Sequence, residues 1–88
     1  MLPDRLDQRI ADAISQTIDQ ERANADTASP AWRQRCEVAR VAMYSDPERR
    51  VFISHVAERR GEAAAHELEQ SASEMRTTAI FFLARKPS

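Results

Sequence analysis

Residues 62–84 read EAAAHELEQSASEMRTTAIFFLA, and the spacing of their apolar side chains decides the expected fold. Five small or apolar residues follow one another in steps of four and three: Leu68, Ala72, Met75, Ala79 and Phe82. This spacing places them on one face of a helix, and such a face packs against other helices. We therefore expect residues 62–84 to form the fourth helix of a helical bundle.

A break within this helix is an open alternative. Ser71 and Glu74 have the spacing of a capping box, in which each side chain satisfies the backbone N–H of the other at a helix start. Residues 62–84 therefore form either one helix or two helices that meet near Gln70 and Ser71.

A second apolar series predicts the first helix, over residues 4–24. Leucine and isoleucine recur at every fourth position here: Leu2, Leu6, Ile10, Ile14 and Ile18. The small and polar residues 24–30 predict its end. Ser29 followed by Pro30 has the pattern of an N-cap and a first helical residue, which predicts a second helix over residues 30–44.

A third helix is expected over residues 46–60. Ser45 and Glu48 fit a capping box at its start. Gly61 follows two arginines, and a glycine in the left-handed conformation behind cations is typical of a helix end. The single glycine of the chain also disfavours a sheet fold with several tight turns. We expect one all-α domain, residues 1–88, of about four helices.

The chain has little material for a large core. Hydrophobic residues make up 42% of its 88 residues, but 15 of them are alanine, which leaves 22 larger side chains. A domain of this size buries only about 60% of the surface that its unfolded chain exposes, so its stability is marginal. The single cysteine excludes an internal disulfide. We therefore expect self-association, as a homodimer, to add stability.

Charge and hydropathy narrow the classes of partner. The formal net charge of −1 gives no general attraction to nucleic acid or to anionic lipid. The first residues lack the basic start and apolar run of a signal peptide, and the longest apolar run, residues 79–84, is far too short to span a membrane. We expect a cytoplasmic protein with no membrane partner.

The residues that could carry chemistry lack the spacing for it. His55 and His66 are 11 positions apart, and Cys36 has no histidine one helical turn away. Cys36 instead shares a helix face with Trp32 and Ala39, which is typical of a small buried side chain. We expect no metal, no cofactor and no enzymatic activity.

Two sets of residues are predicted to contact partners. Four carboxylates fall within about 80° of arc on the first helix, opposite its apolar face, and form an acidic face for a basic groove on a partner protein: Asp4, Asp12, Asp19 and Asp26. The simpler interpretation is a solvated face. Four apolar residues lie off the main apolar faces and are possible dimer or docking contacts: Val38, Val41, Ile80 and Phe81. The second helix is apolar on two sides, so it is either sandwiched within the monomer or covered by another chain.

A DNA-binding reading rests on arginines of the third helix. Arg49, Arg50, Arg59 and Arg60 would contact DNA if the second and third helices formed a helix-turn-helix. Several apolar residues occupy the third helix, which would be the recognition helix, and this leaves few polar side chains to read bases. We therefore expect no direct nucleic-acid binding and keep the regulator as the alternative.

One segment of the chain resembles a known group of proteins. Residues 29–40 read SPAWRQRCEVAR, and Glu-Arg-Arg follows at 48–50 and Arg-Gly at 60–61. This Trp-Arg-x-x-Cys-Glu, Glu-Arg-Arg and Arg-Gly pattern, over about residues 29–68, resembles small uncharacterised helical proteins encoded by bacteriophages and prophages of proteobacteria. Val38 replaces the alanine that usually follows Cys-Glu in that group.

The resemblance implies a phage accessory protein that acts inside a bacterial host cell. Such small proteins often bind one host protein stoichiometrically and inhibit it, and anti-CRISPR inhibitors are one such class. We therefore expect an inhibitor of a host protein, with a CRISPR effector subunit as one candidate target. The alternatives are a small DNA-binding transcriptional regulator that uses the second and third helices, and a bundle that scaffolds phage assembly.

Overall fold

The computed structural model describes residues 5–85 and confirms the all-α fold. Four helices make up this part of the chain, without a strand: α1 (Arg5–Arg22), α2 (Pro30–Met43), α3 (Asp46–Arg60) and α4 (Glu62–Arg85). Their bounds agree with the predicted ranges to within two residues. Because α4 is continuous, the predicted alternative of a break near Gln70 and Ser71 is wrong.

Local capping contacts explain where the helices begin and end. The Ser29 hydroxyl accepts a hydrogen bond from the Trp32 backbone N–H at 3.1 Å at the start of α2. Ser45 and Glu48 form the predicted capping box at the start of α3. Gly61 ends α3 with a φ of 94°, a conformation that favours glycine. These three predictions are confirmed.

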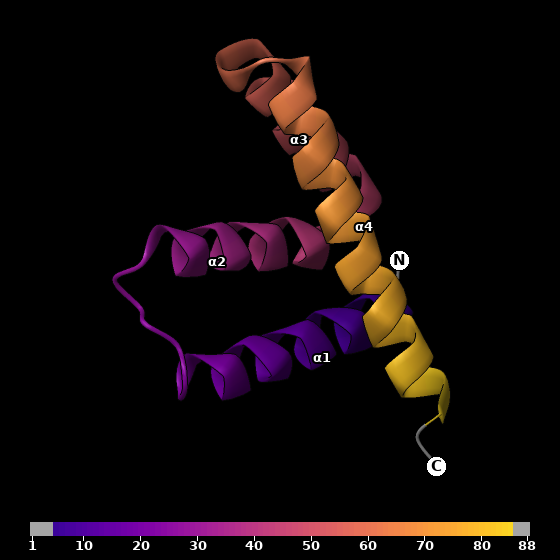
Figure 1. Ribbon diagram of the computed structural model, residues 1–88. Helices are drawn as coiled ribbons and strands as arrows, with labels where there is room; N and C mark the ends of the chain where they lie inside the picture. The colour runs from indigo at the N-terminus through magenta and orange to yellow at the C-terminus, as the bar shows by residue number, and fades with distance from the viewer. Residues whose placement is uncertain (1–4, 86–88) are drawn as a thin grey trace.

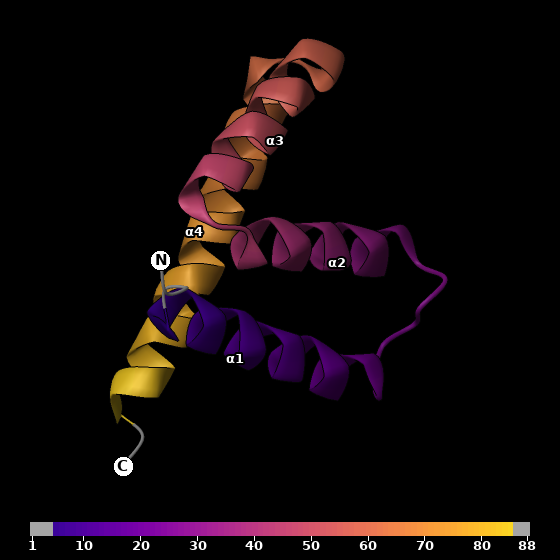
Figure 2. The same cartoon turned by 180° about the vertical axis from the view of Figure 1, so that it is seen from behind.

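The four helices form two hairpins, one of α1 and α2 and the other of α3 and α4. Helix α3 runs antiparallel beside the first half of α4, while α1 and α2 form a second hairpin that projects sideways from the rest of α4 (Figure 1; Figure 2). Helix α4 contacts each of the other helices, whereas α1 and α3 do not touch within the described chain. The result is a flat molecule, 42 × 37 × 19 Å, with open angles between its arms.

The core lies where the α1–α2 hairpin meets α4. Its fully or nearly buried members are Ile10, Ile14, Ile18, Trp32, Val38, Ala39, Val41, Ala42, Val56, Ala65, Leu68, Ala72 and Ala79. The predicted apolar faces of α1 and α4 supply six of these 13 residues, and α2 supplies five. Phe82 is an exception, because it is 57% exposed although its spacing predicts a packed position. It lies in the last turns of α4, beside a groove that the other helices leave unfilled.

Helix α2 is buried on both of its apolar sides. Val38 is 7% exposed and Val41 is fully buried, because α1 and α4 both pack against α2. Of the two alternatives for this helix, the structure shows the sandwich within the monomer, so Val38 and Val41 do not lie on the surface as possible dimer or docking contacts. Alanines on α4, such as Ala72, allow the helices to approach closely enough to cover the valines.

Arginines connect the helices at the margins of the core. Arg76 of α4 donates to the Ala42 carbonyl of α2 at 3.0 Å and to the Asp7 carboxylate of α1 at 3.1 Å. Its side chain is only 14% exposed. Arg76 thus joins three helices with one planar group, which is the kind of contact that several fixed N–H donors permit.

Candidate protein-binding surfaces

The acidic face of α1 is shorter than the sequence predicts. Asp12 and Asp19 are exposed on α1, seven positions apart, so they share one face at a separation of about 10 Å. Asp26 lies beyond α1, because the helix ends at Arg22, and its carboxylate accepts a hydrogen bond from the Ala28 backbone N–H at 3.1 Å. The prediction that Asp26 continues the helical face is therefore wrong, and Asp4 lies outside the described residues.

The acids of α1 have two different roles. Asp7 pairs with Arg76 of α4, and Glu21 pairs with Arg35 of α2 at 2.8 Å, so both tie α1 to another helix. The hydrogen bond from Arg35 lowers the pKa of Glu21 below its ordinary value.

The side-chain hydrogen bonds and ion pairs of Asp12 and Asp19 in the described chain, by contrast, are all made within α1. Asp12 accepts from Gln8 at 3.1 Å, and Asp19 pairs with Arg22 at 3.2 Å. Within the described part of the chain, these two carboxylates therefore add no contact between helices.

The arginines of α3 do not form one basic face. Arg49 donates to the Tyr44 carbonyl and pairs with Asp46. Arg60 pairs with Glu37 of α2 at 3.1 Å. Arg50 and Arg59 are exposed but nine positions apart, which is two and a half turns, so they lie on opposite sides of the helix.

The structure places Cys36, His55 and His66 on three different helices, α2, α3 and α4. Cys36 is half-buried against the core, and His55 and His66 are exposed on different helices. Residues 5–85 hold no group of three or more His, Cys, Asp or Glu side chains that could bind a metal ion.

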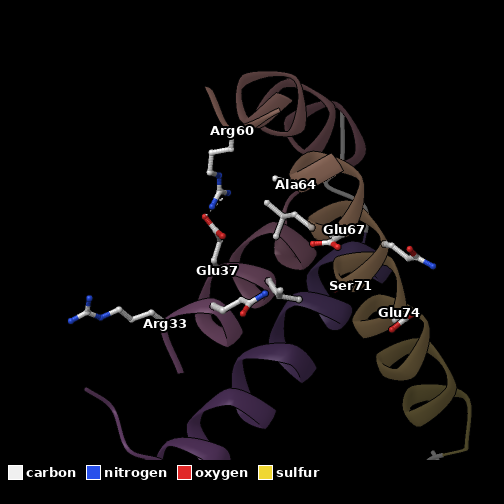
Figure 3. A pocket seen from close by; sticks show the side chains of 11 residues that line it. Arg33, Glu37, Arg60, Ala64, Glu67, Ser71 and Glu74 are labelled. Atoms are coloured by element: carbon white, nitrogen blue, oxygen red, sulfur yellow. Dashed lines mark hydrogen bonds and ion pairs between the residues drawn. The ribbon is translucent and has the colours of Figure 1, made fainter. Parts of the chain in front are cut away.

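A polar cleft of about 710 Å³ lies in the angle between α2 and α4. Figure 3 shows the Arg60 guanidinium and the Glu37 carboxylate pointing toward one another beside it, while Arg33 points away. Glu67 and Glu74 of α4 also line it, and both are exposed. The cleft offers exposed charges of both signs and no histidine to activate its one hydroxyl group, so it is suited to recognition by surface charge.

An apolar groove of about 510 Å³ adjoins this cleft, between α1, α2 and the second half of α4, and the two share Gln34, Val38, Ser71 and Glu74. Ile14, Met75, Ala79 and Phe82 are among the residues that line it.

Three large apolar side chains stand exposed on the last turns of α4, and of these Phe82 lines the groove. Ile80 is 41% exposed and Phe81 64%, so both predicted surface residues do lie on the surface. Phe82, whose spacing predicts a packed position, is also exposed, but it points to another side of α4 than Ile80 does. Exposed aromatic residues beside an apolar groove are typical of a protein-binding surface.

Comparisons with known proteins give one match. A model described as a family of unknown function (DUF7696) matches residues 25–79, which span α2, α3 and most of α4. No curated protein and no solved structure matches the chain. Among the described residues, no helix combines the length and hydropathy needed to cross a membrane.

Proposed function

The chain belongs to the DUF7696 family, and we propose that it binds one protein of a bacterial host stoichiometrically and inhibits it. The resemblance of its Trp-Arg-x-x-Cys-Glu segment to phage-encoded proteins supplies the cellular context. The observation that carries the proposal is the pair Asp12 and Asp19, two exposed carboxylates on one face of α1 that contact no other helix.

This pair is suited to a basic partner surface. Asp12 and Asp19 are separated by about 10 Å along the helix, so they can meet two lysine or arginine side chains that line a groove. Like charges on one helix face do not help folding, whereas complementary charge speeds association with a partner. A groove that normally holds nucleic acid has this character, and a CRISPR effector subunit is one candidate for such a target.

The arginine positions favour protein binding over the alternative of a DNA-binding regulator. Arg49 and Arg60 are already paired with acids of this chain, and Arg50 and Arg59 point in opposite directions. A duplex contacts one face of a recognition helix, so arginines on opposite faces cannot act together on it.

The test begins with affinity capture from the bacterial host, followed by binding kinetics with the purified target. In the double variant Asp12→Lys, Asp19→Lys we expect helicity to be unchanged, association to slow by about tenfold, and its dependence on salt to flatten.

Glu58→Lys, Glu69→Lys is the matched control. It changes the net charge equally at exposed positions on α3 and α4, and should bind nearly as the wild type does. The proposal fails if the Asp12 and Asp19 reversal associates as fast as the control. Capture of DNA that depends on Arg50 would support the regulator instead.

A further inference from the structure

The second half of α4 carries an exposed stripe that the other helices leave uncovered. Glu74, Thr78, Phe81 and Arg85 follow one another in steps of four, three and four, and all four are exposed. Residues with this spacing share one face of a helix, the arrangement used by helices that pair along their length. The stripe therefore has the geometry of a helix-pairing surface.

The two ends of this stripe carry opposite charges. Glu74 lies at one end and Arg85 at the other, with Thr78 and Phe81 between them. Neither charged side chain forms an ion pair or a side-chain hydrogen bond within the described residues, whereas five arginines of this part of the chain pair with acids. Both charges therefore remain available to a partner.

We propose that α4 pairs with α4 of a second copy of this chain, antiparallel, about a two-fold axis between Thr78 and Phe81. In this register Glu74 faces Arg85 of the second copy, and Arg85 faces Glu74 of the second copy. Thr78 faces Phe81 of the second copy in the same way. Every contact occurs twice, as two-fold symmetry requires.

The apolar groove supports this register. Thr78 and Phe82 line the groove and lie one turn apart on α4. Phe81 of the second copy would lie above both of them. Its ring, the Phe82 ring and the Thr78 methyl group would then cover one another. This burial supplies apolar contact that the small core of the chain lacks.

A parallel pair of the same helices would lack this complementarity. Parallel pairing about the same stripe sets Glu74 against Glu74 and Arg85 against Arg85, and like charges at such positions destabilise a helix pair. The stripe complements itself only in the antiparallel direction, which is why a second copy is the occupant that its charges select. The dimer leaves Asp12 and Asp19 of both copies free, so it is independent of the proposed host contact.

Charge exchange tests the register in the full-length protein. We expect the wild type to sediment as a dimer at micromolar concentration. Glu74→Arg and Arg85→Glu should each weaken dimerisation by about tenfold, because every dimer loses two attractive pairs and gains two repulsive ones. The double variant Glu74→Arg, Arg85→Glu restores both pairs in the swapped sense and should recover the affinity of the wild type.

Two controls separate pairing from general effects of charge and polarity. Glu67→Arg alters the same face of α4 one heptad earlier, beyond the paired segment, and should leave the dimer unchanged. Phe81→Ser should dissociate the dimer, whereas Val51→Ser, at an equally exposed apolar residue of α3, should not. Circular dichroism of each variant checks that helicity is kept.

Three results would overturn the inference. The first is a wild type that is monomeric at every concentration up to the millimolar range. The second is a double charge exchange that dimerises no better than the single variants. The third is a dimer that Phe81→Ser leaves intact. None of these results depends on the host protein, so the dimer and the proposed inhibition can fail separately.

Discussion

Replacing Arg76 by methionine should destabilise the protein more than any other single loss of an arginine. Methionine keeps most of the apolar stem but removes the hydrogen bonds to the Ala42 carbonyl and the Asp7 carboxylate. A hydrogen bond from a charged group contributes about 1.5–3 kcal/mol, and a partly exposed ion pair adds up to about 1 kcal/mol. The expected loss in the free energy of unfolding is therefore about 2–4 kcal/mol.

Such a loss is large for this chain. The free energy of unfolding of a domain is about 0.05–0.15 kcal/mol per residue, which gives about 4–13 kcal/mol for 88 residues. Urea unfolding followed by circular dichroism measures the change, and with a slope of about 1–2 kcal/mol per molar the midpoint should fall by about 1–4 M. Arg76→Lys keeps the charge but lacks the planar group. Its urea midpoint should therefore lie between those of the wild type and Arg76→Met.

The control for this experiment is Arg50→Met, because Arg50 is exposed on α3 and forms no side-chain hydrogen bond or ion pair among the described residues. This substitution should change the free energy of unfolding by no more than about 0.5 kcal/mol. Equal losses for Arg76→Met and Arg50→Met would refute the argument that Arg76 joins α1, α2 and α4. Asp7→Asn removes only the ion pair, so it should cost about 1 kcal/mol or less.

Two further perturbations test local features. Gly61→Ala should lower the free energy of unfolding by about 1–3 kcal/mol, because a φ of 94° with a ψ of 161° strains any residue that carries a Cβ, and urea unfolding would show no change if that strain were absent. The lowered pKa of Glu21 in the folded protein makes its pairing with Arg35 stabilising above the unfolded-state pKa of a glutamate, and this stabilisation disappears as the pH falls through the lower folded-state pKa. Glu21→Gln should therefore lose less stability than the wild type between pH 7 and pH 3, and identical pH profiles of the two unfolding midpoints would contradict this.

The helices and their ends follow from short-range chemistry that the sequence states directly. Ser29, the Ser45 and Glu48 pair and Gly61 act on backbone groups within a few residues, so their roles can be predicted without knowing the neighbours in space. The apolar repeat at Ile10, Ile14 and Ile18 predicts a buried face for the same reason, because helical periodicity is a local property.

The candidate surfaces follow from local chemistry only in part. The positions of Asp12, Asp19, Ile80 and Phe81 on the surface could be predicted, because each lies away from the apolar face of its own helix. Asp26 has the helical spacing of Asp12 and Asp19, but it lies four residues beyond the end of α1 at Arg22, where that spacing no longer places it on the same face.

Only the tertiary structure decided which apolar faces are covered, and by what. Val38 and Val41 look like surplus apolar residues along the chain, yet α1 and α4 enclose α2 from two sides and bury them. The spacing of Phe82 places it on the apolar face of α4. The α1–α2 hairpin crosses α4 without filling the groove beside Phe82, so the ring stays exposed. Periodicity states which side of a helix is apolar, whereas burial depends on the crossing angles and lengths of helices far apart in sequence. The contact of Arg76 with Asp7, 69 positions away, was beyond sequence reasoning for the same reason.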